Sequence, residues 1–141
     1  MSEALLSFRN VSVRRGGTIA VRGFTLDIAP GEILALIGLN GAGKSSLLRA
    51  AMGMEALQDG DILFKGGTLA KTDTSDRARL GIGYCPEGRR LFPGMSVSDT
   101  LHAATRAPRK HRISRIDELT KLFPLLGAIL GRESWSLSGG Q

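Results

Sequence analysis

A glycine-rich segment with one lysine is the part of this sequence best suited to chemistry. It reads GLNGAGKS from Gly38 to Ser45, and its glycines allow tight turns that bring successive backbone N–H groups towards an anion. Lys44 can lie along the β- and γ-phosphates of a nucleotide, and the Ser45 hydroxyl can ligate Mg²⁺. The pattern predicts a polyphosphate site. The alternative is a glycine-rich turn that binds nothing.

The flanking segments would hold this loop in place. Ile33 to Ile37 is an unbroken apolar run, typical of a strand buried on both faces of a parallel sheet. Lys44 to about Met52 predicts a helix whose N-terminal N–H groups and partial positive charge face the same anion. Strand, loop and helix thus occur in the order that a phosphate loop requires.

Further elements follow from apolar patterns and turn residues. Leu6 to Val13 and Phe24 to Ile28 alternate apolar and polar residues, which predicts two half-exposed antiparallel strands. Gly53 suits the C-terminal cap of the preceding helix, Asp59-Gly60 suits a turn, and Ile62 to Phe64 suits a short strand. The N-terminal part is therefore expected to be rich in β structure.

The second half of the chain has a helical pattern. After a second short apolar run at Ile82 to Tyr84, which we interpret as another buried strand, residues 93–135 show helical spacing. Ser96 and Asp99 have the spacing of a capping box, and Pro108 interrupts the run. This stretch is expected to form a separate helical subdomain.

A second motif, LSGGQ, occupies Leu137 to Gln141, about a hundred residues after the phosphate loop. With that loop it resembles the nucleotide-binding domain of ABC transporters, in which LSGGQ is the signature motif. The resemblance implies an α/β P-loop ATPase core with an N-terminal antiparallel β subdomain, over residues 1–92, and a helical subdomain, over residues 93–141. It also implies that the C-terminal part of the domain, including a strand beside residues 33–37, lies beyond Gln141.

The resemblance implies ATP and Mg²⁺ as cofactors and a second ATPase subunit, because the signature closes over nucleotide held on a partner's phosphate loop. Lys44 and Glu87 would be catalytic, and Ser45 and Glu87 would face Mg²⁺. A general-base glutamate and a switch histidine would lie beyond the last residue, so these 141 residues alone would bind without turnover. The expected nucleotide contacts are Gly38, Leu39, Asn40, Gly41, Ala42, Gly43, Lys44, Ser45, Ser46, Arg15, Ser138, Gly139, Gly140 and Gln141.

Glu87 stands where the family usually has the glutamine of the Q-loop. A carboxylate can face a metal or an attacking water, but it cannot donate as an amide does. The sequence PEGRRLFP around Glu87 and the sequence ELTKLFPLL at Glu118 to Leu126 resemble those of the ATPases of branched-chain amino acid importers. The alternative is a solvated loop acid.

Arg15 stands where the family places an aromatic residue that stacks on adenine. A guanidinium plane can also stack on a π face, so Arg15 could replace that residue. Equally, Arg14 and Arg15 could be two solvated charges at the end of a strand.

The resemblance predicts the ATP-binding subunit of an importer, peripheral at the cytoplasmic face of the membrane, with permease subunits and, indirectly, a solute-binding protein as partners. Branched-chain amino acids are the expected solute, and urea or another small amide is an alternative. The longest apolar run is too short to span a bilayer. The single cysteine, Cys85, fits a reducing compartment and is expected to be a buried, inert thiol.

Two other functions are open. One is a nucleotide-binding or interaction module without hydrolysis. The other is an ABC ATPase acting on nucleic acid, suggested by the net charge of +6 and a basic cluster. The cluster lacks interleaved aromatic residues, so it is expected to be a solvated helical face and nucleic acid is not an expected partner. Its members are Arg106, Arg109, Lys110, His111, Arg112 and Arg115.

Overall fold

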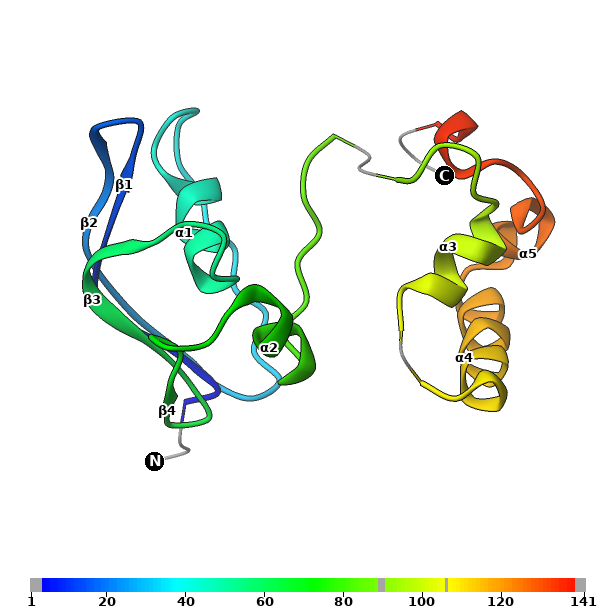
Figure 1. Cartoon of the computed structure of the whole chain (residues 1–141), viewed down its shortest axis with the longest axis horizontal. Coiled ribbons are helices and arrows are strands. Elements are labelled where there is room, and N and C mark those ends of the chain that lie inside the picture. Colours follow the sequence, from blue (N-terminus) through cyan, green and yellow to red (C-terminus); the bar gives the residue numbers. More distant parts are fainter. Residues whose placement is uncertain (1–3, 89–90, 106, 139–141) are drawn as a thin grey trace. The chain divides into compact units, whose positions relative to one another are not determined.

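The computed structural model describes residues 4–88, 91–105 and 107–138. The chain forms two compact units, the first ending at Tyr84 and the second beginning at Cys85, and each is described by itself (Figure 1). The division into 1–92 and 93–141, which follows the positions of motifs, stays a prediction.

The first unit contains a four-stranded antiparallel sheet in the order β2-β1-β3-β4. Its strands are β1 (Leu6–Arg15), β2 (Thr18–Ile28), β3 (Leu57–Phe64) and β4 (Gly67–Thr68). The alternating apolar residues of β1 and β2 put one set of side chains on the core face, which is why these strands form as the sequence predicts.

The Asp59-Gly60 pair does not form a turn, so that prediction is wrong. Both residues lie inside β3, where the pairing register with β1 shifts. Gly60 has φ +83°, and a Cβ there would lie 2.4 Å from the carbonyl oxygens of Arg9 and Asn10. Asn10 itself has φ +51°. The aspartate–glycine pair therefore marks a β-bulge, which uses the same left-handed backbone as a hairpin turn.

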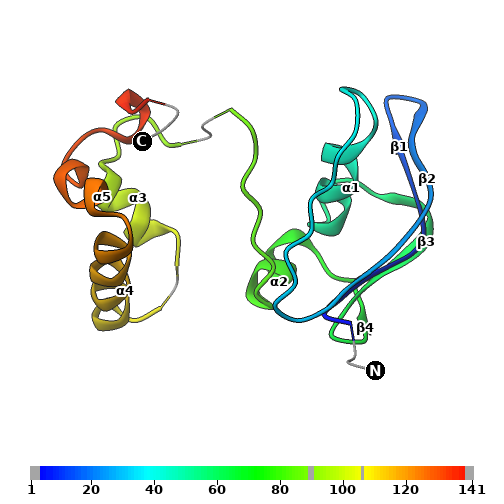
Figure 2. The same cartoon turned by 180° about the vertical axis from the view of Figure 1, so that it is seen from behind.

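Residues 33–37 and 82–84 are not strands, so both predictions of buried strands are wrong. Figure 1 and Figure 2 draw these segments as plain tubes, and Ile33 and Ile37 are 98% and 90% exposed. An apolar run becomes a strand only when neighbouring backbone satisfies its N–H and C=O groups. Among the described residues, no strand pairs with either segment.

Helix α1 (Lys44–Ala51) packs on the core face of the sheet, with Leu47 and Ala50 buried beside Val11 of β1. It ends as predicted at Gly53, which has φ +73° and donates its N–H to the Ala50 carbonyl at 3.0 Å. The Met54 N–H donates to the Arg49 carbonyl at 2.9 Å, which completes a Schellman motif. A glycine with positive φ thus flanks α1 at each end, Gly43 at the N-cap and Gly53 after the C-cap.

Helix α2 (Thr74–Arg79) completes the first unit. Its N-cap is Asp73, whose carboxylate accepts from the Asp76 N–H at 2.8 Å. This hydrogen bond lowers the pKa of Asp73. The helix brings one arginine, Arg77, into the interior, where it is 7% exposed.

The second unit is helical, with α3 (Val97–Ala103), α4 (Arg109–Leu122), α5 (Pro124–Ile129) and a short 3₁₀ turn. The predicted capping box at the start of α3 is present. Pro108 is the N-cap of α4, so the predicted interruption is confirmed. None of the helices in the described ranges is long and apolar enough to cross a bilayer.

Candidate functional site

The loop before α1 turns tightly at its glycines. Gly41 and Gly43 have φ +85° and +90°, and the Ala42 N–H donates to the Leu39 carbonyl at 3.2 Å. Gly43 also lies against β2, because a Cβ there would be only 2.2 Å from the Ala20 carbonyl oxygen. This position therefore needs glycine for its backbone angles and for its close approach to the strand.

Lys44 is the first residue of α1, and its side chain folds back over the loop. Its ammonium group donates to the carbonyls of Gly38 at 2.6 Å and Leu39 at 2.8 Å. Ser45 is exposed and Ser46 is buried. The first turn of α1 has neither a capping side chain nor an acidic residue. The helix N-terminus therefore presents N–H groups and positive charge without a carboxylate that would repel an anion.

This set of groups fits a nucleoside triphosphate. Backbone N–H groups, one ammonium and a helix N-terminus are the partners that phosphate oxygens require. The described residues hold no group of three or more His, Cys, Asp or Glu side chains that could cage a metal ion. A single hydroxyl such as that of Ser45 is still sufficient, because Mg²⁺ in such sites takes most of its ligands from phosphate and water. The residues present therefore fit Mg²⁺ bound together with ATP.

Arg15 belongs to an ion-pair cluster that sequence reasoning missed. Its side chain is 65% exposed, and its Nε lies 3.8 Å from a carboxylate oxygen of Glu55. Arg49 of α1 binds the same oxygen at 2.6 Å, and this hydrogen bond raises the pKa of Arg49. Arg15 is therefore oriented by Glu55 at the end of β1. No local sequence signal pairs residues 40 positions apart, so only the fold reveals this cluster.

The remaining predicted site residues lie in the second unit. Glu87 and Ser138 are both exposed. Gly139, Gly140 and Gln141 lie outside the described residues. The structure thus brings residues 38–46 and Arg15 together in one unit, and the roles predicted for Glu87 and the signature stay predictions.

Cys85 is exposed, so the prediction of a buried thiol is wrong. The segment 82–84 before it forms no strand, which leaves Cys85 open to solvent.

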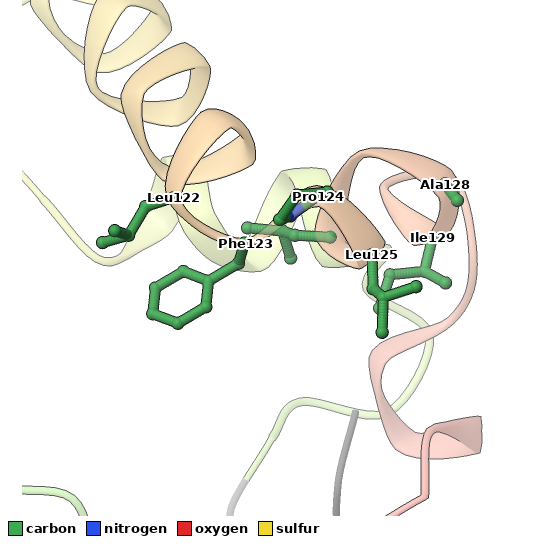
Figure 3. Close-up of a pocket in the computed structure, with 7 residues that line it drawn as sticks. Leu122, Phe123, Pro124, Leu125, Ala128 and Ile129 are labelled. Carbon is green, nitrogen blue, oxygen red and sulfur yellow. The ribbon is translucent and has the colours of Figure 1, made fainter.

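The second unit also carries an apolar cavity of about 460 Å³, where α4 meets α5 (Figure 3). Leu122, Phe123 and Leu125 line it and are 70%, 57% and 81% exposed. So much exposed apolar surface on one short segment is typical of a surface that binds another protein.

The basic cluster is partly engaged in contacts within the second unit. Arg112 donates to the His102 carbonyl at 3.0 Å, and Arg115 forms an ion pair with Glu118. Arg106 lies outside the described residues. These contacts favour the prediction of a solvated helical face.

Comparison with known proteins supports the resemblance found in the sequence. The ABC transporter family model matches residues 21–141. The chain is 34% identical, over 82% of its length, to a probable branched-chain amino acid transport ATP-binding protein LivF of Archaeoglobus fulgidus, and 33% identical, over 97%, to the high-affinity branched-chain amino acid transport protein BraG of Pseudomonas aeruginosa. It covers 49% and 59% of these proteins and so spans about half the length of the curated relatives it matches.

Solved structures agree on the fold. An ATP-binding subunit of an ABC transporter superposes with a TM-score of 0.82 at 27% identity, over 96% of this chain and 57% of that one. The protein cbiO1 of Clostridium perfringens, part of the transporter complex cbiONQ, gives a TM-score of 0.77 at 25% identity, over 99% of this chain and 58% of that one. The predicted fold class is thereby confirmed, and the chain belongs to the ABC transporter family.

Proposed function

We propose that this chain is part of the ATP-binding subunit of an ABC importer, and that it binds ATP with Mg²⁺ at residues 38–46. The observation that carries the proposal is the loop at the N-terminus of α1, where Gly43 packs against β2 and the Lys44 ammonium spans two loop carbonyls. A loop held in this shape needs little reorganisation to accept phosphate.

Each residue would have a separate task. The loop N–H groups and Lys44 would hold the β- and γ-phosphates, Ser45 would ligate Mg²⁺, and Arg15 would contact the base. Glu87 would face the metal or the attacking water, and Ser138 would contact nucleotide held by a second subunit. ATP supplies the free energy that the importer couples to movement of a solute.

Branched-chain amino acids are the proposed solute. The support is the similarity to LivF and BraG, together with the sequence around Glu87. Relatives of similar identity are named for other solutes, such as the sn-glycerol-3-phosphate import protein UgpC of Bordetella pertussis, at 33%. A small amide remains the alternative solute, and uptake measured with labelled leucine and urea distinguishes the two.

The proposed partners are a second ATPase subunit, membrane permease subunits and, indirectly, a solute-binding protein, which places the chain at the cytoplasmic face of the membrane. The apolar cavity at Leu122 to Ile129 supports a protein partner for the helical unit. A nucleic-acid partner has less support, because Arg115 of the basic cluster is paired with Glu118 and the cluster lacks aromatic residues.

Isothermal titration calorimetry of the full chain with Mg-ATP tests the proposal. Lys44→Ala removes the ammonium and is expected to weaken binding at least about tenfold, since a charge-assisted bond to phosphate contributes about 1.5–3 kcal/mol. Lys71→Ala, at an exposed lysine in the same unit, is the control and is expected to bind as the wild type does. Undiminished affinity in Lys44→Ala would refute the proposed site.

Phosphate release measured beside affinity separates an ATPase from a binding module. Turnover by residues 1–141 themselves would overturn the expectation that hydrolysis needs a general-base glutamate beyond Gln141. Tight binding of Mg-ATP without release of phosphate supports the module without hydrolysis.

A further inference from the structure

The buried arginine of α2 is bound at the opposite end of α1 from the phosphate loop. The Arg77 guanidinium donates to the carbonyls of Ala50 at 2.8 Å and Ala51 at 2.9 Å, which are the last two residues of α1. It also donates to the carbonyls of Leu69 at 2.7 Å and Thr72 at 3.2 Å, and to the Thr72 hydroxyl at 3.1 Å. One side chain thus joins the end of α1 to the segment between β4 and α2.

All of these partners are neutral. Within the described residues, Arg77 forms no ion pair with a carboxylate, and Asp61 acts on it only through its charge at longer range. Burial lowers the pKa of Arg77, which shows that the interior disfavours its charge. A buried cation of this kind is held by the negative end of the α1 dipole and by the carbonyls of the last helical turn, of which that of Ala50 also accepts from the Gly53 N–H.

The residue that follows the C-cap of α1, Gly53, lies close to the guanidinium. A Cβ at Gly53 would lie 3.1 Å from Arg77 Nε and 3.2 Å from Cζ. At the other end of α1, a Cβ at Gly43 would lie 2.2 Å from the Ala20 carbonyl. The residues that flank α1 are thus close to neighbouring groups at both ends of the helix.

We propose that Arg77 is a positioning residue for the phosphate loop, fixing α1 from its C-terminus so that Lys44 and Ser45 stay in register with β2. The inference rests on the proposed function, because it assigns Arg77 to the same ATP site. Arg77 would act without touching the nucleotide, because its hydrogen bonds lie at the opposite end of α1 from the phosphate loop. It acts by holding the helix that carries the phosphate-binding groups.

Three variants of the full chain test the inference, with Kd measured for Mg-ATP and for Mg-tripolyphosphate. Arg77→Met keeps the length of the side chain but removes every donor, and we expect both Kd values to rise about tenfold, since small shifts of a positioned group are costly. Arg77→Lys keeps the charge and part of the donor set, so it restores part of the affinity. Thr72→Val removes one acceptor and gives a smaller rise.

Phe24→Leu is the matched control, because it weakens the edge-to-face contact with Phe8 without changing the ends of α1. All titrations are made well below the melting temperature of each variant, with folding checked by circular dichroism. We expect Phe24→Leu to melt lower and to bind as the wild type does. If Arg77 only stabilised the fold, Arg77→Met would likewise melt at a lower temperature and bind both probes as the wild type does.

The inference is overturned if folded Arg77→Met binds both probes as the wild type does. If Arg77→Met does not fold, unchanged Kd values in both Arg77→Lys and Thr72→Val overturn it. A rise for Mg-ATP alone also contradicts it, because a displaced phosphate loop weakens both probes equally. Failure of the proposed function has a different signature, since the wild type would then bind neither probe.

Discussion

Gly43 shows how closely the phosphate loop packs against β2. The residue has φ +90°, and the Ala20 carbonyl oxygen occupies the place where a Cβ would begin. A methyl group at this position would therefore clash with the backbone of β2. It would also force an L-residue into a left-handed backbone conformation, which is strained. The loop depends on this glycine more than on its neighbours.

We predict that Gly43→Ala lowers the stability of the first unit by about 2 kcal/mol or more and raises the Kd for Mg-ATP at least about tenfold. Gly41→Ala is the matched variant, because Gly41 has φ +85° but no heavy atom within 4 Å of its Cβ position. It should lose only about 1 kcal/mol. Equal losses of stability in urea unfolding would contradict this account of Gly43.

The phosphate-loop residues can be proposed from the sequence alone, because the motif is local and each residue type has a direct chemical reason. It does not predict Glu55 or Arg77. Their partners are 40 and 27 positions away, and hydrogen bonds over such distances depend on how the elements pack. For the same reason, Cys85 could not be placed on the surface from its neighbours alone.

At the scale of elements, the capping box of α3 offers a test of local stability. The Ser96 hydroxyl accepts from the Asp99 N–H at 3.0 Å and donates to the Asp99 carboxylate. We predict that Ser96→Ala lowers stability at pH 7 by about 1 kcal/mol. Ser98→Ala, in the same helix, is the control and should change stability little. Urea unfolding followed by circular dichroism checks both.

The effect of Ser96→Ala should depend on pH. The hydrogen bond from Ser96 lowers the pKa of Asp99, so the ionised carboxylate stabilises the folded state at pH above its ordinary pKa. That contribution is lost as pH falls through the lowered pKa. The difference between wild type and variant should therefore be full at about pH 6 and shrink below about pH 4. A difference that grows towards acid pH would contradict the assignment.

The elements predicted from alternation and capping are present, and the buried strands predicted from the apolar runs at 33–37 and 82–84 are not. Alternation in β1 and β2 is satisfied within one sheet, α1 ends at the glycine Gly53, and α3 begins with its own capping box. Residues 33–37 could form a buried strand only with neighbouring strands on both edges and helices on both faces. The apolar pattern of a segment does not show whether these neighbours are present. The bulge at Gly60 shares its residue types with a turn, so the sequence could not tell them apart.

At the scale of the whole molecule, the exposed apolar surface between α4 and α5 is the clearest sign of a partner. We predict that Leu125→Ser reduces solute uptake by the assembled transporter and weakens copurification with the permease. The stability of the chain should change by less than about 0.5 kcal/mol, because Leu125 is 81% exposed and packs little. Uptake in proteoliposomes and thermal unfolding measure the two effects.

Leu80→Ser is the control, since Leu80 is also an exposed leucine, 47% accessible, at the end of α2 in the first unit. It should leave uptake and copurification unchanged. Normal assembly and uptake in Leu125→Ser would remove the support that this surface gives to a membrane partner.

The exposure of Cys85 has a practical consequence. The chain has one cysteine, and it is solvent-accessible at the first residue of the second unit. A maleimide dye would therefore attach at a single known point, without any engineered substitution. Fluorescence from that point would report changes in the surroundings of Cys85 when nucleotide is added.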